Sequence, residues 1–447
     1  MPVQQPDDPE HSASHYRHLA RGFNWLGGAT VVSRAIDFAV ILIVLLYLTK
    51  DQVGIASLVI SVGMIVEGFD GLGTSEAMIQ ARSVSRLQLD TLFWIILGVA
   101  GTAAGLTLLA APLIEKVYGV PGMAAYFIVV AIKQPLVGAA VIPLALLNRR
   151  LKYERIAAVN VFSTLAAALT RLVLAIGGAG AWALVVASAS SGFYTLIGAW
   201  LLKPFCPRLR FHWAGILPLM RFGVRATASN IFEQMFKNID SLLLGAFYGA
   251  AQLAIYRVAF DVAMQPALAV GTLVNRTAMP VFARVSRVGD QLAQSLRWSL
   301  RRLVILVAPV TVGLILVAHP LMTLLHDGEG HSYAAAALPL QLLAAAALLR
   351  VSSQLLMPFL LGTGHPGTVA CLSAATLMLL GAGILAACLI FPAPTGIIAV
   401  SGVWLGVYPL LLIWGVIYLR LHWDIRAGDL GRAFVMPRRA GKARSDR

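Results

Sequence analysis

The chain has 447 residues, of which 59% are hydrophobic and only 12% are charged. Soluble globular proteins carry roughly 25% charged residues, so this composition excludes a soluble protein and indicates a chain that crosses a membrane many times. A net charge of +15 is also found in proteins that bind nucleic acids. Here the basic residues lie at predicted membrane borders, where anionic lipids attract them, and we expect no nucleic-acid partner.

Hydrophobic segments long enough for one membrane crossing, at about 20 residues per helix, follow one another along the whole chain. The first six occupy residues 23–48, 53–79, 91–113, 122–147, 156–177 and 180–202. The second six occupy residues 219–247, 252–282, 300–325, 334–361, 367–391 and 395–419. The sequence therefore predicts an all-α polytopic membrane protein with about twelve transmembrane helices.

These segments divide the chain into predicted domains. They are an N-terminal tail (1–22), an N-lobe (23–202), a linker (203–218), a C-lobe (219–419) and a basic C-terminal tail (420–447). The polar N-terminus has no apolar core followed by a small-residue cleavage site, so we expect no cleavable signal peptide. Of the 35 Lys and Arg residues, 25 lie in the two tails and at alternate span borders, while the opposite borders hold only Lys50 and Lys116. The positive-inside rule therefore places both termini in the cytoplasm.

The two halves of the chain weakly repeat each other. Residues 49–55 match residues 249–255, and Val84-Ser85-Arg86 matches Val285-Ser286-Arg287. Six spans per repeat is an even number, so both copies enter the membrane from the same side, as in parallel repeats with the substrate path between them. The sequence predicts two pseudo-symmetric six-helix lobes around a central cavity.

Charged residues inside the predicted spans are the candidate site. Each costs at least ~2.5–3.5 kcal/mol in hydrocarbon, so they should face a protein interior or a watery cavity. The cations are Arg34, Lys133, Arg171, Arg225, Lys237, Arg257, Arg276 and Arg350. The carboxylates include Asp37, Glu67, Asp70, Asp240 and Asp261. The predominance of cations suggests a cavity for an anionic ligand. The alternative is structural pairing along one helix, because Arg34–Asp37, Lys237–Asp240 and Arg257–Asp261 have i, i+3 or i+4 spacing.

Other kinds of site find little support in the sequence. The loop at residues 326–333 contains two histidines and two acids, but their spacing matches no strong metal site. Cys206, Cys371 and Cys388 are scattered and indicate neither a metal site nor a disulfide framework. No nucleophile elbow or phosphate loop is present. We therefore expect no metal, no cofactor and no enzyme activity.

Several short motifs resemble those of a known family. Residues 69–75 (FDGLGTS) and 78–80 (MIQ) resemble the end of the second span in polysaccharide-unit flippases of the Wzx type. Asn238-Ile239-Asp240 and Tyr256-Arg257-Val258-Ala259 resemble the signature of their seventh and eighth spans. These flippases belong to the multidrug/oligosaccharidyl-lipid/polysaccharide (MOP) exporter superfamily, and the resemblance extends from about residue 20 to residue 420.

The resemblance implies a MATE-like fold and a flippase in the bacterial inner membrane. Its substrate would be a polyprenyl-pyrophosphate-linked oligosaccharide, a repeat unit of lipopolysaccharide, O-antigen or exopolysaccharide, moved by alternating access with an ion gradient. The cations named above, apart from Arg171, would bind the anionic substrate through charge-assisted hydrogen bonds. The five carboxylates would couple transport to protons or sodium. Membrane lipids, a glycan polymerase and chain-length proteins of the same pathway would be partners.

Two alternatives to a flippase stay open. A drug or metabolite cation antiporter could use the same fold, but its cavity should be rich in acids, whereas bases predominate here. A membrane glycan polymerase or ligase should carry a large outer catalytic loop, and the longest predicted outer loop is the short one around residues 326–333.

Overall fold

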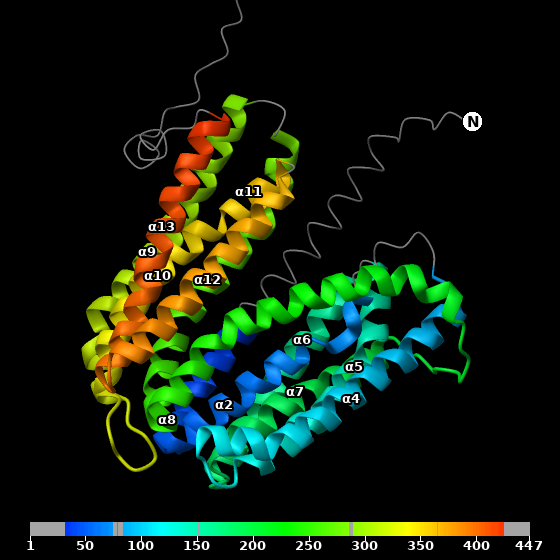
Figure 1. The fold of residues 1–447 in the computed structure, drawn as a ribbon, viewed down its shortest axis with the longest axis horizontal. Coiled ribbons are helices and arrows are strands. Elements are labelled where there is room, and N and C mark those ends of the chain that lie inside the picture. The colour runs from blue at the N-terminus through cyan, green and yellow to red at the C-terminus, as the bar shows by residue number, and fades with distance from the viewer. Residues whose placement is uncertain are drawn as a thin grey trace, which may run out of the picture. The chain divides into compact units, whose positions relative to one another are not determined.

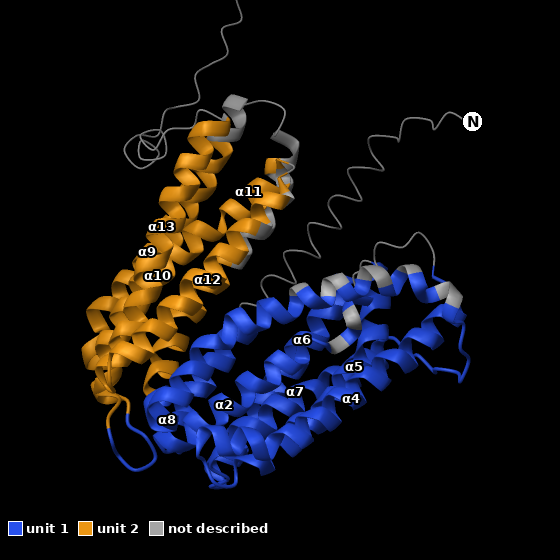
Figure 2. Cartoon of the chain, viewed as in Figure 1, with its two compact units in different colours: residues 1–254, 326–331 blue, residues 255–325, 332–447 orange. Residues whose placement is uncertain are grey.

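The structure is a computed structural model that describes residues 32–74, 78, 84–150, 152–285, 289–363 and 365–423. Almost all of these residues are helical, and the chain forms two compact units (Figure 2). Unit 1 comprises Met1–Ala254 and His326–His331, and unit 2 comprises Ile255–Leu325 and Ser332–Arg447. The predicted N-terminal tail, the start of the first predicted span and residues 424–447 lie outside the described residues.

Unit 1 is a bundle of long helices (Figure 1). After a helix at residues 32–45 come α2 (Lys50–Glu67), the short 3-10 helix η1 (Asp70–Gly73), α4 (Arg86–Tyr118), α5 (Met123–Arg149), α6 (Tyr153–Ile176) and α7 (Ala181–Leu202). Helix α5 packs against both α4 and α7, and α6 packs against α7. This packing brings α2, α5 and α7 together, which positions the polar cluster described below.

Two capping boxes fix where α2 and α4 begin. The Thr49 hydroxyl accepts a hydrogen bond from the backbone N–H of Gln52, whose side chain accepts one from the Thr49 N–H. Ser85 and Gln88 form the same reciprocal pair at the start of α4. Each box satisfies two backbone donors that a helix start would otherwise leave unpaired.

Helix α2 ends earlier than the predicted span 53–79. The α-helix stops at Glu67, and Asp70–Gly73 form a turn of 3-10 helix. Gly71 and Gly73 have φ values of 74° and 57°, which glycine adopts at little cost and which an α-helix cannot contain. The two glycines therefore redirect the chain just after Glu67.

The longest helix, α8 (Trp213–Val285), covers two predicted spans. Its only non-helical residue is Gly249, with φ 80° and ψ 177°, a region that is essentially reserved for glycine. The helical segments before and after Gly249 correspond to the predicted spans 219–247 and 252–282, and the turn lies where the sequence predicts it.

Unit 2 contains the end of α8 and the remaining helices (Figure 1). These are α9 (Gly289–Leu324), the 3-10 helix η2 (Ala334–Ala336), α10 (Ala337–Gln354), α11 (Leu356–Gly362), α12 (Pro366–Ile390) and α13 (Thr395–Trp423). Helix α10 packs against both α9 and α13. Its alanines at 344, 346 and 347 are fully buried, since small side chains let neighbouring helices approach closely.

Among the described residues, nine helices are long and apolar enough to cross a membrane. One of them, Asn230–Gly271, contains the turn at Gly249 and so belongs to two predicted crossings. Two further predicted crossings fall on residues 32–45 and on α2, which carries the charged residues Lys50, Asp51 and Glu67. The prediction of an all-α polytopic membrane protein is confirmed.

The compact units divide the chain at a different place from the predicted lobes, whose boundaries stay a prediction. The division lies between Ala254 and Ile255, because the first part of α8 packs within unit 1. Two glycines permit this packing. A Cβ atom on Gly54 would collide with the backbone carbonyl of Ala250, and a Cβ on Gly245 would collide with the side chain of Leu58.

The loop between α9 and α10 also packs within unit 1. The N–H of Gly328 donates to the carbonyl of Leu48 (3.0 Å), and the Lys50 ammonium lies 3.8 Å from the Asp327 carboxylate. Asp327 Oδ1 further accepts hydrogen bonds from the backbone N–H groups of Glu329 and His331. The residues 326–331 are therefore held by specific contacts, with Asp327 acting as a structural anchor.

Candidate functional site: the intramembrane charge pairs

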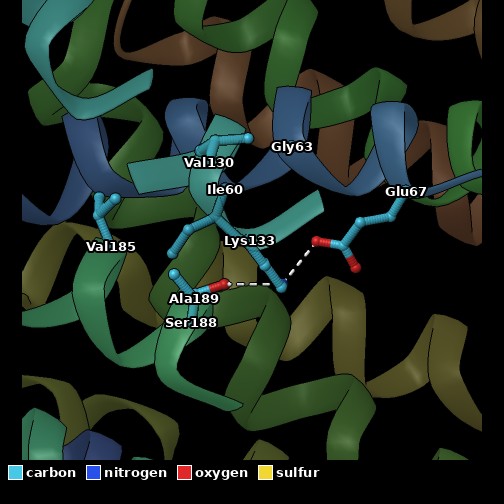
Figure 3. Close-up of a pocket in the computed structure, with 8 residues that line it drawn as sticks. All are labelled: Ile60, Gly63, Glu67, Val130, Lys133, Val185, Ser188 and Ala189. Carbon is cyan, nitrogen blue, oxygen red and sulfur yellow. Dashed lines mark hydrogen bonds and ion pairs between the residues drawn. The ribbon is translucent and has the colours of Figure 1, made fainter. Parts of the chain in front are cut away.

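Three helices of unit 1 build a polar cluster around Lys133 (Figure 3). Lys133 of α5 places its Nζ 2.5 Å from Oε1 of Glu67, the last residue of α2, and 3.4 Å from the hydroxyl of Ser188 on α7. The small pocket around these groups is otherwise lined by Ile60, Gly63, Val130, Val185 and Ala189. A cation, a carboxylate and a hydroxyl thus converge in an apolar surrounding.

Small residues make room for this cluster. A Cβ atom on Gly192 would lie 2.9 Å from the Val137 side chain and 3.3 Å from Cγ of Lys133. Glycine at this position of α7 therefore lets the Lys133 side chain lie along the helix. Lys133 is only 8% exposed, and a buried charge is tolerated only when it is paired and hydrogen-bonded. The pair with Glu67 is the condition for burying Lys133.

A second ion pair joins residues 32–45 to α6. An Nη1 atom of Arg171 lies 2.7 Å from Oδ1 of Asp37, and both side chains are largely buried. Asp37 was a candidate partner of Arg34, one turn away, but Arg171 takes that place. The Arg34 side chain is exposed and forms no ion pair within the described part of the chain.

In the first part of α8, Lys237 and Asp240, whose spacing suggests an ion pair, have different surroundings. Lys237 lies 2.6 Å from Glu233, and both side chains are largely exposed. Asp240, by contrast, is fully buried, and its Oδ1 accepts a hydrogen bond of 2.7 Å from the backbone N–H of Ser241. The predicted pair Lys237–Asp240 is therefore wrong, because the two side chains lie on differently exposed sides of the helix.

In unit 2, one pair forms as the spacing predicts. Nε of Arg257 donates to Oδ2 of Asp261 over 3.1 Å, one helical turn along α8. The other oxygen of Asp261 is buried and accepts no hydrogen bond from a described residue. Within the described part of the chain, the pair therefore leaves one carboxylate oxygen available to a further donor.

Arg350 of α10 is the buried cation of unit 2. It is 6% exposed, and its guanidinium lies 5.1 Å from the centre of a Trp404 ring and 3.9 Å, through Nη1, from the sulfur of Met264. Among the described residues, no carboxylate lies within ion-pair distance of Arg350 and its Nε has no hydrogen-bond partner. The aromatic face of Trp404 supplies cation–π stabilisation in place of a counter-ion.

The structure brings together some predicted residues and leaves others undescribed. It pairs Lys133 with Glu67 and Arg257 with Asp261, each joining a predicted substrate-binding residue to a predicted coupling residue. The side chains of Arg225, Arg276 and Asp70 lie outside the described part of the structure. Ser188 has no sequence signal beyond a run of small residues, whereas Arg171 was visible as an intramembrane charge. In the described residues, no group of His, Cys, Asp or Glu is arranged to hold a metal ion.

Comparison with known proteins places this arrangement in a family. The family described as "Polysaccharide biosynthesis protein" matches residues 46–331. The lipopolysaccharide biosynthesis protein WzxC of Escherichia coli is 25% identical over 340 residues, covering 74% of this chain and 67% of the relative. The succinoglycan biosynthesis transport protein ExoT of Rhizobium meliloti is 24% identical over 348 residues, covering 78% and 70%.

Solved structures show the same fold at low sequence identity. The lipid II flippase MurJ, in an inward closed conformation, aligns with a TM-score of 0.70 at 12% identity, covering 92% of this chain and 90% of MurJ. An inward-facing multidrug MATE transporter of the MOP superfamily aligns with a TM-score of 0.59 at 13% identity, covering 90% and 94%. The MATE-like fold expected from the sequence motifs is confirmed, and the chain belongs to the polysaccharide biosynthesis protein family.

Proposed function

We propose that the protein is a flippase that moves a polyprenyl-pyrophosphate-linked oligosaccharide across the bacterial inner membrane. Family membership, relatives named for lipopolysaccharide biosynthesis and for succinoglycan transport, and the fold shared with a lipid II flippase support this proposal. The substrate joins an anionic pyrophosphate to a polar glycan and a lipid tail. It needs a polar path for the head, while the polyprenyl tail remains in the lipid.

The observation that carries the proposal is the incomplete neutralisation of the intramembrane cations. Lys133, Arg171 and Arg257 each have a carboxylate partner. Arg34 and Arg350 have none among the described residues, and Arg34 is exposed as well. An exposed guanidinium that forms no ion pair with a described residue fits the planar, charge-assisted recognition of phosphate. Arg34 is therefore the cation best placed to bind the pyrophosphate.

The paired carboxylates provide the coupling step in this proposal. Protonation of Glu67 or Asp261, or binding of sodium, weakens its hold on Lys133 or Arg257 and frees that cation for the substrate. Return of the negative charge draws the cation back and helps to eject the phosphate. Arg225, Lys237, Arg276 and Arg350 complete the proposed substrate-binding set, and Asp37, Asp70 and Asp240 complete the coupling set. We also propose the orientation that the positive-inside rule predicts, with both termini in the cytoplasm.

An antiporter for cationic drugs fits these observations less well. The MATE fold is shared by multidrug transporters, but a site for organic cations needs unpaired carboxylates. In the described pairs of unit 1, Glu67, Asp37 and Glu233 each hold a basic side chain. The names of the sequence relatives point to polysaccharide biosynthesis and transport, and not to glycan polymerisation or ligation.

The test is to deplete the protein and follow the lipid-linked oligosaccharide. Spheroplasts are treated with an impermeant glycan-modifying reagent, which reaches only the outer leaflet. The expected result is accumulation of unmodified intermediate in the cytoplasmic leaflet, reversed by re-expression. Accumulation in the outer leaflet would contradict the proposal and point to a step after translocation.

A further inference from the structure

The connection between α7 and α8 (residues 203–212) and Trp213, the first residue of α8, form a segment that we call the interfacial strap. Its backbone is bound to α4: the indole N–H of Trp94 donates to the carbonyl of Arg208 (3.1 Å), and the N–H of His212 donates to the hydroxyl of Thr91 (3.0 Å). Phe205 is 1% exposed and packs 5.8 Å, centre to centre, from the ring of Phe93. The strap therefore follows the side of α4.

The outer side of the strap combines apolar and basic side chains. Leu209, Phe211 and Trp213 are 76%, 66% and 63% exposed, and Arg208, Arg210 and His212, which alternate with them, are exposed too. Water would solvate the basic groups but not three large apolar side chains within five residues. Between Glu154 and Glu233 the sequence contains no acidic residue, and the nearby Asp90 of α4 is buried and paired with Arg86.

The position of the strap along α4 indicates which layer of the membrane lies beside it. Helix α4 has 33 residues, about 50 Å at 1.5 Å per residue, against a hydrocarbon core of ~30 Å. A helix of this length that crosses the core upright and centred has about 10 Å in the headgroup layer at each end. Thr91 and Trp94 lie about 7–12 Å from the first residue of α4. The strap is thus at the level where headgroups meet acyl chains.

We propose that residues 208–213 form a docking surface for anionic phospholipids of the adjacent leaflet, the cytoplasmic one in the proposed orientation. Leu209, Phe211 and Trp213 enter the acyl boundary, where aromatic residues are favoured. Arg208 and Arg210 bind lipid phosphates, their apolar stems lying along the same boundary. A second copy of this chain is a poor occupant, because two such basic surfaces repel each other.

The test uses the full-length protein in lipid nanodiscs. In a background with Cys206, Cys371 and Cys388 changed to Ser, an environment-sensitive fluorophore is attached at Phe211→Cys. The expected result is a blue-shifted emission, quenched by brominated lipids and resistant to iodide. The same label at Glu329→Cys, on the loop at residues 326–331, serves as the water-exposed control and should be quenched by iodide.

Lipid specificity is measured at the same position. Brominated phosphatidylglycerol should quench the label at 211 more strongly than brominated phosphatidylcholine at equal mole fraction. Arg208→Gln with Arg210→Gln should lower this preference about twenty-five-fold, since each cation near an anionic leaflet contributes roughly a factor of five. The matched pair Arg301→Gln and Arg302→Gln, on α9 of unit 2, should leave the preference at 211 unchanged.

Three results would overturn the proposal. Iodide quenching at 211 without quenching by brominated lipids means that the strap faces water. Protection from both quenchers means that protein covers it, a second copy or a partner. An equal loss of preference with the α9 pair means that total charge, and not the strap, selects the lipid. None of these readouts involves transport, so the flippase proposal stands or falls separately.

Discussion

Lys133 Nζ lies 2.5 Å from Glu67 Oε1 and 3.4 Å from the Ser188 hydroxyl, so one buried cation of α5 contacts side chains of both α2 and α7. Buried ion pairs contribute little net stability relative to apolar replacements, but removing one partner leaves an uncompensated charge. Removing one partner of the pair should therefore destabilise the protein, whereas replacing both should not. This difference allows the structural role of the pair to be separated from its role in transport.

The first prediction separates these two roles of Lys133. Glu67→Gln should destabilise the protein by about 3–5 kcal/mol, because it leaves Lys133 buried without a counter-ion. The double change Glu67→Gln with Lys133→Met should restore most of the stability and still fail to export glycan. Thermal unfolding in detergent and an export assay measure the two effects. Normal export by the double variant would remove the pair from the mechanism.

The second prediction compares two arginines that the structure treats differently. Arg34→Ala should abolish export without loss of stability, because Arg34 is exposed and forms no ion pair among the described residues. Arg34→Lys should retain part of the activity, since an ammonium lacks the bidentate geometry of a guanidinium. Arg171→Ala should instead lower thermal stability, because it leaves Asp37 without its counter-ion. If Arg34→Ala exports normally, this residue does not bind the substrate.

The third prediction concerns coupling at the aspartates. Asp37→Asn and Asp240→Asn should still bind substrate but transport it poorly, with a flattened dependence on a proton or sodium gradient. Asn keeps the size of the side chain while removing its charge, so packing around the buried Asp240 is conserved. Asp37→Asn also leaves Arg171 without its counter-ion and should lower thermal stability as well, so stability is measured beside transport. Transport into vesicles under an imposed gradient measures the effect. An unchanged gradient dependence in both variants would leave Glu67, Asp70 and Asp261 as the coupling candidates.

The fourth prediction tests the close helix packing of unit 1. Gly54→Ala should cost about 1–3 kcal/mol, as overpacking does, because the new methyl group meets the backbone carbonyl of Ala250 and not a movable side chain. The matched control is Gly98→Ala in α4, where nothing lies within 4 Å of the added Cβ. That change should be neutral or stabilising, since alanine favours helix. Thermal unfolding of the two variants gives the comparison, and equal midpoints would contradict the packing.

The fifth prediction fixes the orientation in the membrane. With Cys371 and Cys388 changed to Ser, the exposed native Cys206 should react with an impermeant thiol reagent only in inside-out vesicles. With all three cysteines changed to Ser, His331→Cys should react only in right-side-out cells. Labelling of both positions from the same side would exclude the twelve-span arrangement.

Local spacing predicted the features that depend on one helix, and packing decided the rest. The turn at Gly249 and the pair Arg257–Asp261 follow from neighbours in sequence and were predictable. The pairs Lys133–Glu67 and Arg171–Asp37 join residues far apart in the chain, and periodicity carries no information on which helices meet. The pair Lys237–Asp240 failed for the same reason, since burial of Asp240 depends on the helices that surround α8.

The turn at Gly249 also limits how the two halves of the gene can recombine. In the sequence repeat, Gly249 corresponds to Thr49, yet Thr49 has φ −74° and caps α2 with its side chain, whereas Gly249 has φ 80°. A crossover that copied residues 49–55 onto 249–255 would place a β-branched residue in a backbone region that costs about 1–3 kcal/mol for non-glycine residues. The reverse exchange would remove the cap of α2, at about 1 kcal/mol or less, and would place alanine at position 54, where a Cβ atom meets the backbone carbonyl of Ala250, at about 1–3 kcal/mol. Gene conversion between the repeats is therefore disfavoured at this turn in both directions.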